Sequence, residues 1–261
     1  MLKDGITDFI QTLSDLVFPP ACHFCDSPEV ESGFEICADC AESITRIEPP
    51  ICAQCGLPLA HNTTHEMLFC GTCLTDPPAY GTARFGTAYE GDLRQALKNF
   101  KYNGQLRLSS ALGQLLSEAF FRYYDPAQFD VIVPVPIHRK KLLERGFNQA
   151  VILARKLSKN TGIPLDRNSF KKIRDTPAQA RLSKKERQRN LKGSFQVSRL
   201  NAIKDKRILL VDDVATTGST ITEASRTLHK AGAAQVSVLV LALTLPGKSE
   251  PEGSTNAHSK R

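Results

Sequence analysis

The sequence predicts an α/β protein with a parallel sheet and flanking helices, preceded by a small cysteine-rich unit. Apolar runs at 129–136, 208–211 and 235–243 alternate with segments whose apolar residues fall at helical spacing. This alternation is typical of strand–helix–strand units, which build parallel sheets. All eight cysteines lie between residues 22 and 73, so the cysteine-rich unit is confined to the first third of the chain.

Length and composition place the chain among ordinary globular proteins. Its 261 residues are enough for one large or two modest domains, and 41% of them are hydrophobic. The sequence has no apolar run of about 18 residues, so we expect no insertion into a membrane. The N-terminal residues include acidic side chains and lack the apolar core of a signal peptide, which favours a cytoplasmic protein.

Positive charge is concentrated in one part of the chain. Residues 138–192 contain 17 Lys and Arg against four Asp and Glu, whereas the whole chain has a net charge of only +7. The rest of the chain is therefore net acidic. The basic segment indicates a polyanionic ligand or a nucleic acid, and the alternative is a solvated, lysine-rich surface.

We expect four segments. Residues 1–18 predict an amphipathic packing helix that ends at two prolines; its acidic polar face argues against the alternative of a helix lying on a membrane. Residues 19–78 contain the cysteines and end at Asp-Pro-Pro. Residues 79–245 form the α/β domain, and residues 246–261 form a polar, disordered tail.

The cysteines form four Cys-x-x-Cys pairs with none left over. In a chain expected in a reducing compartment, this pattern predicts two tetrahedral zinc sites of four thiolates each, with a structural or partner-binding role. Sequential pairing is the simplest arrangement, and an interleaved one stays open. The predicted zinc ligands are Cys22, Cys25, Cys37, Cys40, Cys52, Cys55, Cys70 and Cys73.

The α/β domain begins with a predicted strand at 84–89 and helices at 93–100 and about 106–124. A buried strand at 129–136 ends in Pro-Val-Pro, and the basic residues 138–141 follow it. The segment 145–149 then opens a helix that closes near Gly162. A rigid, basic turn at a strand end suits a diphosphate, and the alternative is a connecting turn with incidental surface lysines.

The segment 171–192 is basic and polar, and we interpret it as a mobile lid inserted between strands. It contains a short predicted helix at 184–190 with Ser183 as its cap and Glu186 three residues later. The alternative is a disordered insertion. Residues 193–197 predict a return to a strand.

The stretch around which the chain is organised runs from 206 to 232. A buried strand at 206–212 ends in the acidic pair Asp212 and Asp213, a loop of small and hydroxyl residues follows, and a helix runs from 221 to 231. Amides at a helix start attract phosphate, whereas two carboxylates suit sugar hydroxyls or Mg²⁺. A sugar phosphate with a free diol fits both halves of this loop. The alternative, a capped helix after a core strand, leaves the two aspartates unexplained.

The residues from Asp212 to Thr220 resemble the phosphoribosyl-pyrophosphate (PRPP) loop of type I phosphoribosyltransferases. The order of parts narrows the resemblance to the ComF (ComFC/GntX-like) family: paired cysteines, then Val-Pro-Val-Pro with Arg-Gly-Phe-Asn-Gln, then the basic segment, then the PRPP loop. The resemblance covers residues from about 19 to 245. It implies a double zinc ribbon followed by a type I phosphoribosyltransferase-like parallel sheet with flanking helices.

The resemblance also implies functional residues. Asp212 and Asp213 would hold the ribose diol and, indirectly, Mg²⁺, while Arg139 would contact pyrophosphate and residues 171–190 would form a hood. We therefore place Asp212, Asp213 and Arg139 in the catalytic set. The substrate-binding set is Val135, Pro136, His138, Lys140, Arg174, Ala215, Thr216, Thr217, Gly218, Ser219 and Thr220.

Three functions compete. The first is a magnesium-dependent transferase that uses PRPP, with electrostatic catalysis, no evident general base and an unnamed acceptor. The second is a module that binds PRPP or DNA without turnover, and the third is a zinc-bearing adaptor. The family resemblance implies natural competence, meaning uptake and use of single-stranded DNA, with helicase-like or recombination-mediator partners.

Overall fold

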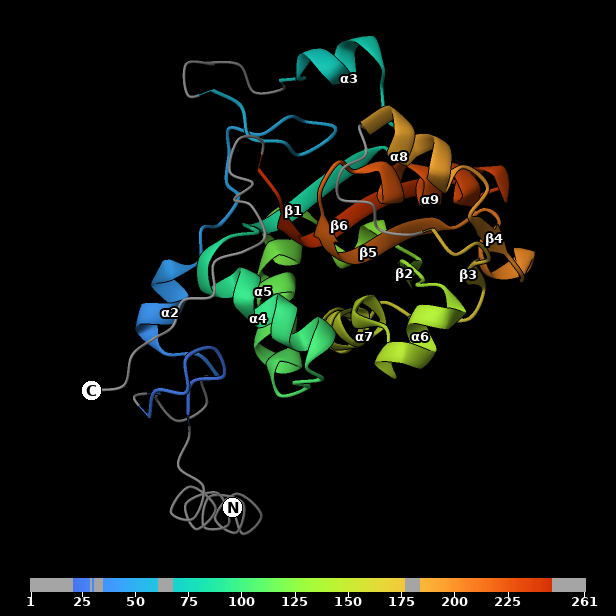
Figure 1. Ribbon diagram of the computed structural model, residues 1–261. Helices are drawn as coiled ribbons and strands as arrows, with labels where there is room; N and C mark the ends of the chain where they lie inside the picture. The colour runs from blue at the N-terminus through green and yellow to red at the C-terminus, as the bar shows by residue number, and fades with distance from the viewer. Residues whose placement is uncertain (1–20, 29, 31–34, 61–67, 177–183, 246–261) are drawn as a thin grey trace, which may run out of the picture.

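The computed structural model describes residues 21–28, 30, 35–60, 68–176 and 184–245 (Figure 1). The predicted N-terminal helix, the Ser183 cap and the predicted C-terminal tail lie outside these residues. None of the helices in the described part of the chain has the length and apolar character that a bilayer crossing requires.

The main sheet has four strands in the order β1-β6-β5-β2, and every neighbouring pair is parallel. This confirms the predicted fold class. The strands are β1 (Thr82–Ala88), β2 (Val131–Pro134), β5 (Arg207–Ala215) and β6 (Gln235–Leu243). The carboxyl ends of the central β5 and the edge strand β2 therefore lie side by side.

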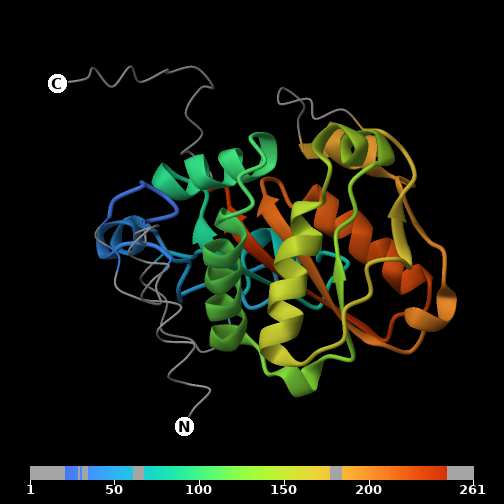
Figure 2. The same ribbon diagram turned by 90° about the horizontal axis from the view of Figure 1, so that it is seen from below.

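Helices cover both faces of the sheet. α5 and α7 pack side by side across one face, where Figure 2 shows them in green and yellow, and α9 lies on the other face. The helices of this domain are α4 (Gly91–Tyr102), α5 (Leu108–Tyr123), α6 (Arg139–Arg145), α7 (Gln149–Thr161), α8 (Lys184–Leu191) and α9 (Ser219–Lys230), with 3-10 turns at Pro126–Gln128 and Leu200–Ala202.

The central strands are apolar at consecutive positions because both of their faces are buried. Ile208 and Leu210 of β5 pack into the core on the α9 side, whereas Leu209 and Val211 pack into the core on the α5 and α7 side. All four side chains are fully buried. This explains why the sequence shows continuous apolar runs and no alternation.

Two elements differ from the sequence-based prediction, and both differences bear on the site. β5 does not end at Asp212 but continues to Ala215, because Val214 and Ala215 still pair with β6. The basic stretch after β2 is not a turn but the helix α6, which ends at Gly146 with φ +79°, so α7 starts only at Gln149. Glycine tolerates this left-handed conformation, which makes the sharp reversal between α6 and α7 possible.

The segment predicted as a lid has a more ordered base than expected. β3 (Phe170–Lys172) and β4 (Phe195–Val197) form a separate antiparallel pair, so residues 193–197 do not return to the main sheet. The rings of Phe170 and Phe195 stack with centroids 5.3 Å apart. Residues 177–183 between β3 and α8 lie outside the described part.

The cysteine-rich segment covers the exposed edge of β1. It contains the short helices α2 (Ala38–Ser43) and α3 (Gly71–Thr75). The Ile47 N–H of this segment donates to the Gly86 carbonyl of β1, and the Ala83 N–H of β1 donates to the Gln54 carbonyl. The edge of β1 is therefore occupied and cannot pair with a strand of another chain.

Candidate functional site

The acidic pair splits between the two faces of the sheet. Since β5 continues past them, Asp212 and Asp213 point to opposite faces, as alternate residues of a strand must. Asp213 faces helix α4, where the Lys101 Nζ lies 2.6 Å from the Asp213 Oδ2. The two side chains are only 19% and 9% exposed, so this ion pair is largely shielded from water.

Charge interactions shift the pKa values of the groups around the pair. Burial alone would lower the pKa of Lys101, but the carboxylates of Asp213 and Asp212 outweigh this effect and raise it. Burial and the neighbouring carboxylate of Asp213 raise the pKa of Asp212 well above its ordinary value. The site thus has one carboxylate compensated by a lysine and a second whose charge is unfavourable until a cation or hydrogen-bond donor arrives.

Lys172 of β3 belongs to the surroundings of Asp212 on the opposite face. Burial and the charge of Lys141 lower the pKa of Lys172, while Asp212 and Asp175 act in the opposite direction. Its Nζ lies 5.7 Å from the centroid of the Phe195 ring. The base of the predicted lid therefore delivers a lysine to the site.

The loop after β5 ends in a left-handed glycine that opens α9. Gly218 adopts φ +71°, a conformation that favours glycine, and it precedes the first residue of α9. The first amides of a helix have no partner within the helix and point outward from its start. The hydroxyls of Thr217 and Ser219 lie 2.9 Å apart, so hydroxyl groups gather at the same point.

The end of β2 is locked beside β5. The Val135 N–H donates to the carbonyl of Val211, and the Asn148 side chain donates to the carbonyl of Val135. Asn148 also accepts from the Ala150 N–H and so caps α7. One side chain of the Arg-Gly-Phe-Asn-Gln motif thus fixes both a helix start and the turn predicted to bind pyrophosphate.

His138 links this turn to the lid base. It forms a parallel bridge with Lys172 of β3, and its Nδ1 accepts from the Lys140 N–H. Arg139 and Lys140 are exposed on α6. Within the described residues, neither side chain has a contact that joins it to the acidic pair.

The structure gathers most of the predicted residues at one edge of the sheet. Residues 135–140 follow β2 and residues 212–220 span the end of β5, and these strands are hydrogen-bonded neighbours. Arg174 is placed differently: its guanidinium donates to the carbonyl of Lys192 at the base of the lid. The roles assigned to all these residues in binding and catalysis stay predictions.

Sequence reasoning did not assign Lys101 to the site, and it included Lys172 only as part of the hood at 171–190. Lys101 lies more than a hundred residues before Asp213 in the chain, and only the packing of α4 on the sheet brings the two together. The one local signal was the cluster of Lys98, Lys101 and Tyr102 beside an Asn-Gly turn. Tyr102 is 68% exposed. The Arg145 guanidinium lies over its ring, 4.9 Å from the ring centroid.

The eight cysteines form two compact clusters. Within each cluster the four Sγ atoms all lie within 4.8 Å of one another. The clusters are sequential: Cys22, Cys25, Cys37 and Cys40 form one, and Cys52, Cys55, Cys70 and Cys73 form the other. The interleaved alternative is therefore wrong, and the predicted two four-thiolate zinc sites are confirmed.

The donor chemistry of both clusters fits zinc. All eight cysteines are free; the Sγ atoms of Cys25 and Cys37 lie 3.7 Å apart and those of Cys55 and Cys70 3.6 Å, well beyond a covalent bond of about 2.05 Å. Burial disfavours the Cys52 thiolate, but backbone N–H donors outweigh burial and lower its pKa to about 6. Cys22 behaves in the same way, with a pKa lowered to about 7. A thiolate held by N–H groups is the form that ligates zinc.

Two family profiles match separate parts of the chain. Residues 13–74 match the family profile described as "Double zinc ribbon domain", and residues 105–259 match "Phosphoribosyl transferase domain". Among solved structures, a purine phosphoribosyltransferase from Pyrococcus horikoshii is 20% identical, with 56% of this chain and 92% of that chain covered and a TM-score of 0.30. An orotate phosphoribosyltransferase from Aeropyrum pernix is 22% identical, with 54% and 63% covered and a TM-score of 0.33.

Curated relatives are closer in sequence. "DNA utilization protein YhgH" of Escherichia coli K12 is 34% identical over 88% of this chain and 100% of the relative. "Competence protein F" of Haemophilus influenzae is 33% identical over 79% of this chain and 90% of the relative. "Competence protein ComFC" of Bacillus subtilis is 30% identical over 79% of this chain and 83% of the relative.

The sheet, the two zinc-binding sites and the matched profiles define a phosphoribosyltransferase-fold protein with a double zinc ribbon. The identities and the coverage of the relatives then settle the family. The chain belongs to the ComF family of competence proteins.

Proposed function

We propose that the protein binds PRPP with Mg²⁺ at the carboxyl ends of β2 and β5 and transfers its phosphoribosyl group. The observation that carries this proposal is the acidic pair on β5 followed at once by the glycine turn that opens α9. In open α/β sheets, ligands bind outside the carboxyl ends of the strands. Here that position combines carboxylates for hydroxyls with a helix start for phosphate.

Each half of the ligand has its own residues in this proposal. Asp212 accepts hydrogen bonds from the ribose hydroxyls on the face of β5 that the lid base covers, and residues 215–220 surround the 5-phosphate. Residues 135–140, which include Arg139, bind pyrophosphate, and Asn148 holds Val135 in place. The lid base brings Lys172 over the site, and we assign Lys101 the role of holding the Asp213 carboxylate in place.

The residues present fit a magnesium ion bound together with PRPP. Mg²⁺ prefers oxygen ligands and usually keeps several waters, with one or two carboxylates and substrate phosphates. Asp212 offers carboxylate oxygens of this kind, and a bound cation would offset the burial and the neighbouring Asp213 charge that raise its pKa. When bound, Mg²⁺ neutralises charge on the departing pyrophosphate.

Catalysis in this proposal is electrostatic. The bond between the anomeric carbon and the pyrophosphate oxygen breaks, positive charge develops on the ribose ring, and the acceptor atom forms the new bond. Asp212 stabilises the ring through its hydroxyls, the basic residues stabilise the leaving group, and the lid excludes water.

The test is calorimetric titration of the zinc-loaded protein with PRPP in the presence of Mg²⁺. We expect binding that is lost in Asp212→Asn and retained in Asp205→Asn, which changes an exposed aspartate outside the site. Absence of PRPP binding in the unmodified protein would overturn the proposal. Pyrophosphate release upon adding free bases or single-stranded DNA then separates a transferase from a module that binds PRPP without turnover.

A second candidate function is binding of single-stranded DNA. The observations that favour it are the exposed basic side chains Arg139 and Lys140 on α6 and the word DNA in the name of the Escherichia coli relative. Phosphate contacts release counterions, so the affinity should fall steeply between 50 and 200 mM salt, roughly a decade or more for several contacts. An affinity unchanged by salt would contradict this role for α6. The helicase-like or recombination-mediator partners and the cytoplasmic location stay predictions.

A further inference from the structure

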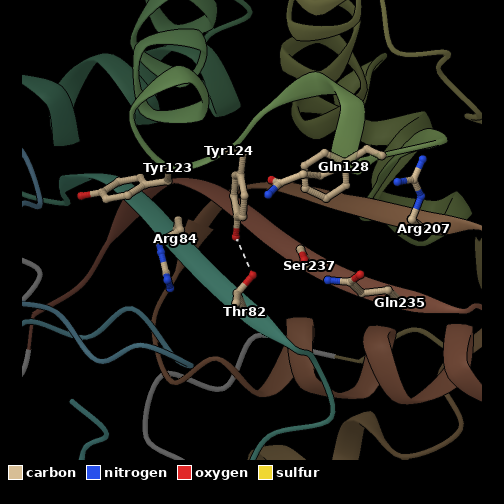
Figure 3. A pocket seen from close by; sticks show the side chains of 9 residues that line it. Thr82, Arg84, Tyr123, Tyr124, Gln128, Arg207, Gln235 and Ser237 are labelled. Carbon is tan, nitrogen blue, oxygen red and sulfur yellow. Dashed lines mark hydrogen bonds between the residues drawn. The ribbon is translucent and has the colours of Figure 1, made fainter. Parts of the chain in front are cut away.

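A cavity lies at the end of the sheet opposite the acidic pair. It has a volume of about 290 Å³ and opens beside the amino ends of three strands: Thr82 begins β1, Arg207 begins β5 and Gln235 begins β6 (Figure 3). The acidic pair lies toward the carboxyl end of β5, so this cavity is separate from the proposed PRPP site. Its size is near the lower end for ligand pockets, which start at about 300 Å³.

The floor and rim of the cavity offer unused hydrogen-bonding groups. Ser237 is only 2% exposed, and its side chain lines the cavity. The carboxamides of Gln128 and Gln235 reach in from opposite sides, and Figure 3 shows the Ser237 hydroxyl between them. The Gln128 Oε1 accepts from the Asp125 N–H, so its amino group stays available as a donor.

Aromatic side chains also line the cavity. Tyr123, Tyr124 and Phe129 line the cavity, and the Tyr124 hydroxyl is held by Thr82 at 3.1 Å. The Tyr124 and Phe129 rings meet edge to face with centroids 5.3 Å apart, so this part of the lining is rigid. Aromatic rings and two carboxamides in one cavity suit a planar ring with a polar edge, the chemistry of a nucleobase.

The two arginines of the cavity differ in how their charge is compensated. The Arg207 guanidinium is bound to both carboxylate oxygens of Asp130. Arg84 donates to the carbonyls of Ala83 and Ala53 and lies 5.8 Å from the Tyr123 ring centroid. Within the described residues Arg84 has no carboxylate partner, so the cavity has an uncompensated positive charge at one end.

We propose that this cavity binds a nucleoside monophosphate, with the base against the aromatic rings and the two glutamines and the phosphate at Arg84. The volume admits a single nucleotide and excludes a strand. Because Arg84 also holds the carbonyl of Ala53, between the zinc ligands Cys52 and Cys55, the bound nucleotide contacts the junction of the two domains.

The test is calorimetric titration of the zinc-loaded full chain with AMP and CMP in the Asp212→Asn background, which removes binding of either nucleotide at the proposed PRPP site. We expect Gln235→Leu and Ser237→Val to weaken binding roughly tenfold each, since each removes hydrogen bonds to the ligand. Arg84→Gln should weaken it further and bring the affinity close to that of the free nucleoside. Gln114→Leu, an exposed glutamine on α5, serves as the matched control and should change nothing.

Three results would overturn the proposal: no binding of either nucleotide at 1 mM, equal affinity in Gln235→Leu and Gln114→Leu, or inorganic phosphate binding as tightly as the nucleotides. Zinc content measured for each variant separates a lost contact from a disturbed zinc site. The outcome is independent of the PRPP proposal, because PRPP binding is measured separately on the unmodified chain.

Discussion

At the scale of single residues, the site depends on which way each aspartate of β5 faces. Asp213 meets Lys101 from α4, whereas Asp212 lies on the face of β3 and Lys172. The sequence shows the two carboxylates and the phosphate loop, since these are adjacent in the chain. It does not show the lysines, because their approach depends on the packing of distant elements.

The ion pair of Lys101 can be tested by removal of one partner. Lys101→Met leaves the buried Asp213 carboxylate without its counter-charge, so we expect the free energy of unfolding to fall by about 3 kcal/mol in denaturant titration. The double variant with Asp213→Asn should recover much of this loss, because no unpaired charge remains. Lys98→Met is the matched control on the same helix, and a loss equal to that of the control would contradict the assignment.

The raised pKa of Asp212 predicts an unusual pH dependence. A carboxyl whose pKa is higher in the folded state binds more protons there, so its charge destabilises the fold above its folded pKa, and this cost disappears below about pH 4. Asp212→Asn should therefore raise the melting temperature at pH 7, and the gain should shrink as the pH falls.

Substitution of Asp130 should change the melting temperature in the opposite direction. Its hydrogen bonds from Arg207 lower its pKa to about 2, so it stabilises the fold above pH 4 and loses this effect as the pH falls toward 2. Asp130→Asn should lower the melting temperature at pH 7. If the two variants shifted the melting temperature in the same direction at pH 7, one of the two pKa shifts would have the wrong sign.

At the scale of elements, the strong periodicities predicted strands and helices well, and the boundaries near the site less well. β6 was placed at its observed limits because its apolar run is flanked by polar residues on both sides. The end of β5 was missed because aspartates are poor strand residues, and only pairing with β6 keeps them in the strand. α6 was missed because its sequence is basic with two exposed leucines, so it shows no buried face.

The start of α7 gives a prediction at this scale. Asn148→Ala removes both the cap of α7 and the bond to the Val135 carbonyl, so we expect about 1–2 kcal/mol lower stability. The segment between β2 and α6 should also loosen, which weakens PRPP binding beyond the stability effect. Asn201→Ala, an exposed asparagine in a 3-10 turn, is the control in thermal unfolding and titration. Unchanged PRPP affinity in a folded Asn148→Ala would contradict the positioning role.

At the scale of the whole molecule, the two zinc sites are attached differently. The cluster that contains Cys52, Cys55 and Cys73 packs into the same core as the sheet strands. The cluster that contains Cys22, Cys37 and Cys40 forms a small core of its own. The cysteine pairs themselves could be predicted from spacing, but this unequal attachment could not, since it depends on the sheet against which each site packs.

Two matched substitutions test the difference. Cys22 and Cys52 are both fully buried and each begins its Cys-x-x-Cys pair. We expect each change to serine to release one zinc per chain, measured by metal analysis. Cys52→Ser should also lower the main calorimetric transition, whereas Cys22→Ser should leave it nearly unchanged. Equal shifts in the two variants would show that both sites share one cooperative unit.

Residues 45–54 are hydrogen-bonded along the edge of β1, and this has a consequence for the solubility of the purified protein. If metal is withdrawn from the second site, these residues loosen and the bare flank of the sheet becomes available to another copy of the chain. Chelating buffers should then cause the protein to aggregate, and light scattering should increase with protein concentration. Restoring the metal early should reverse the effect.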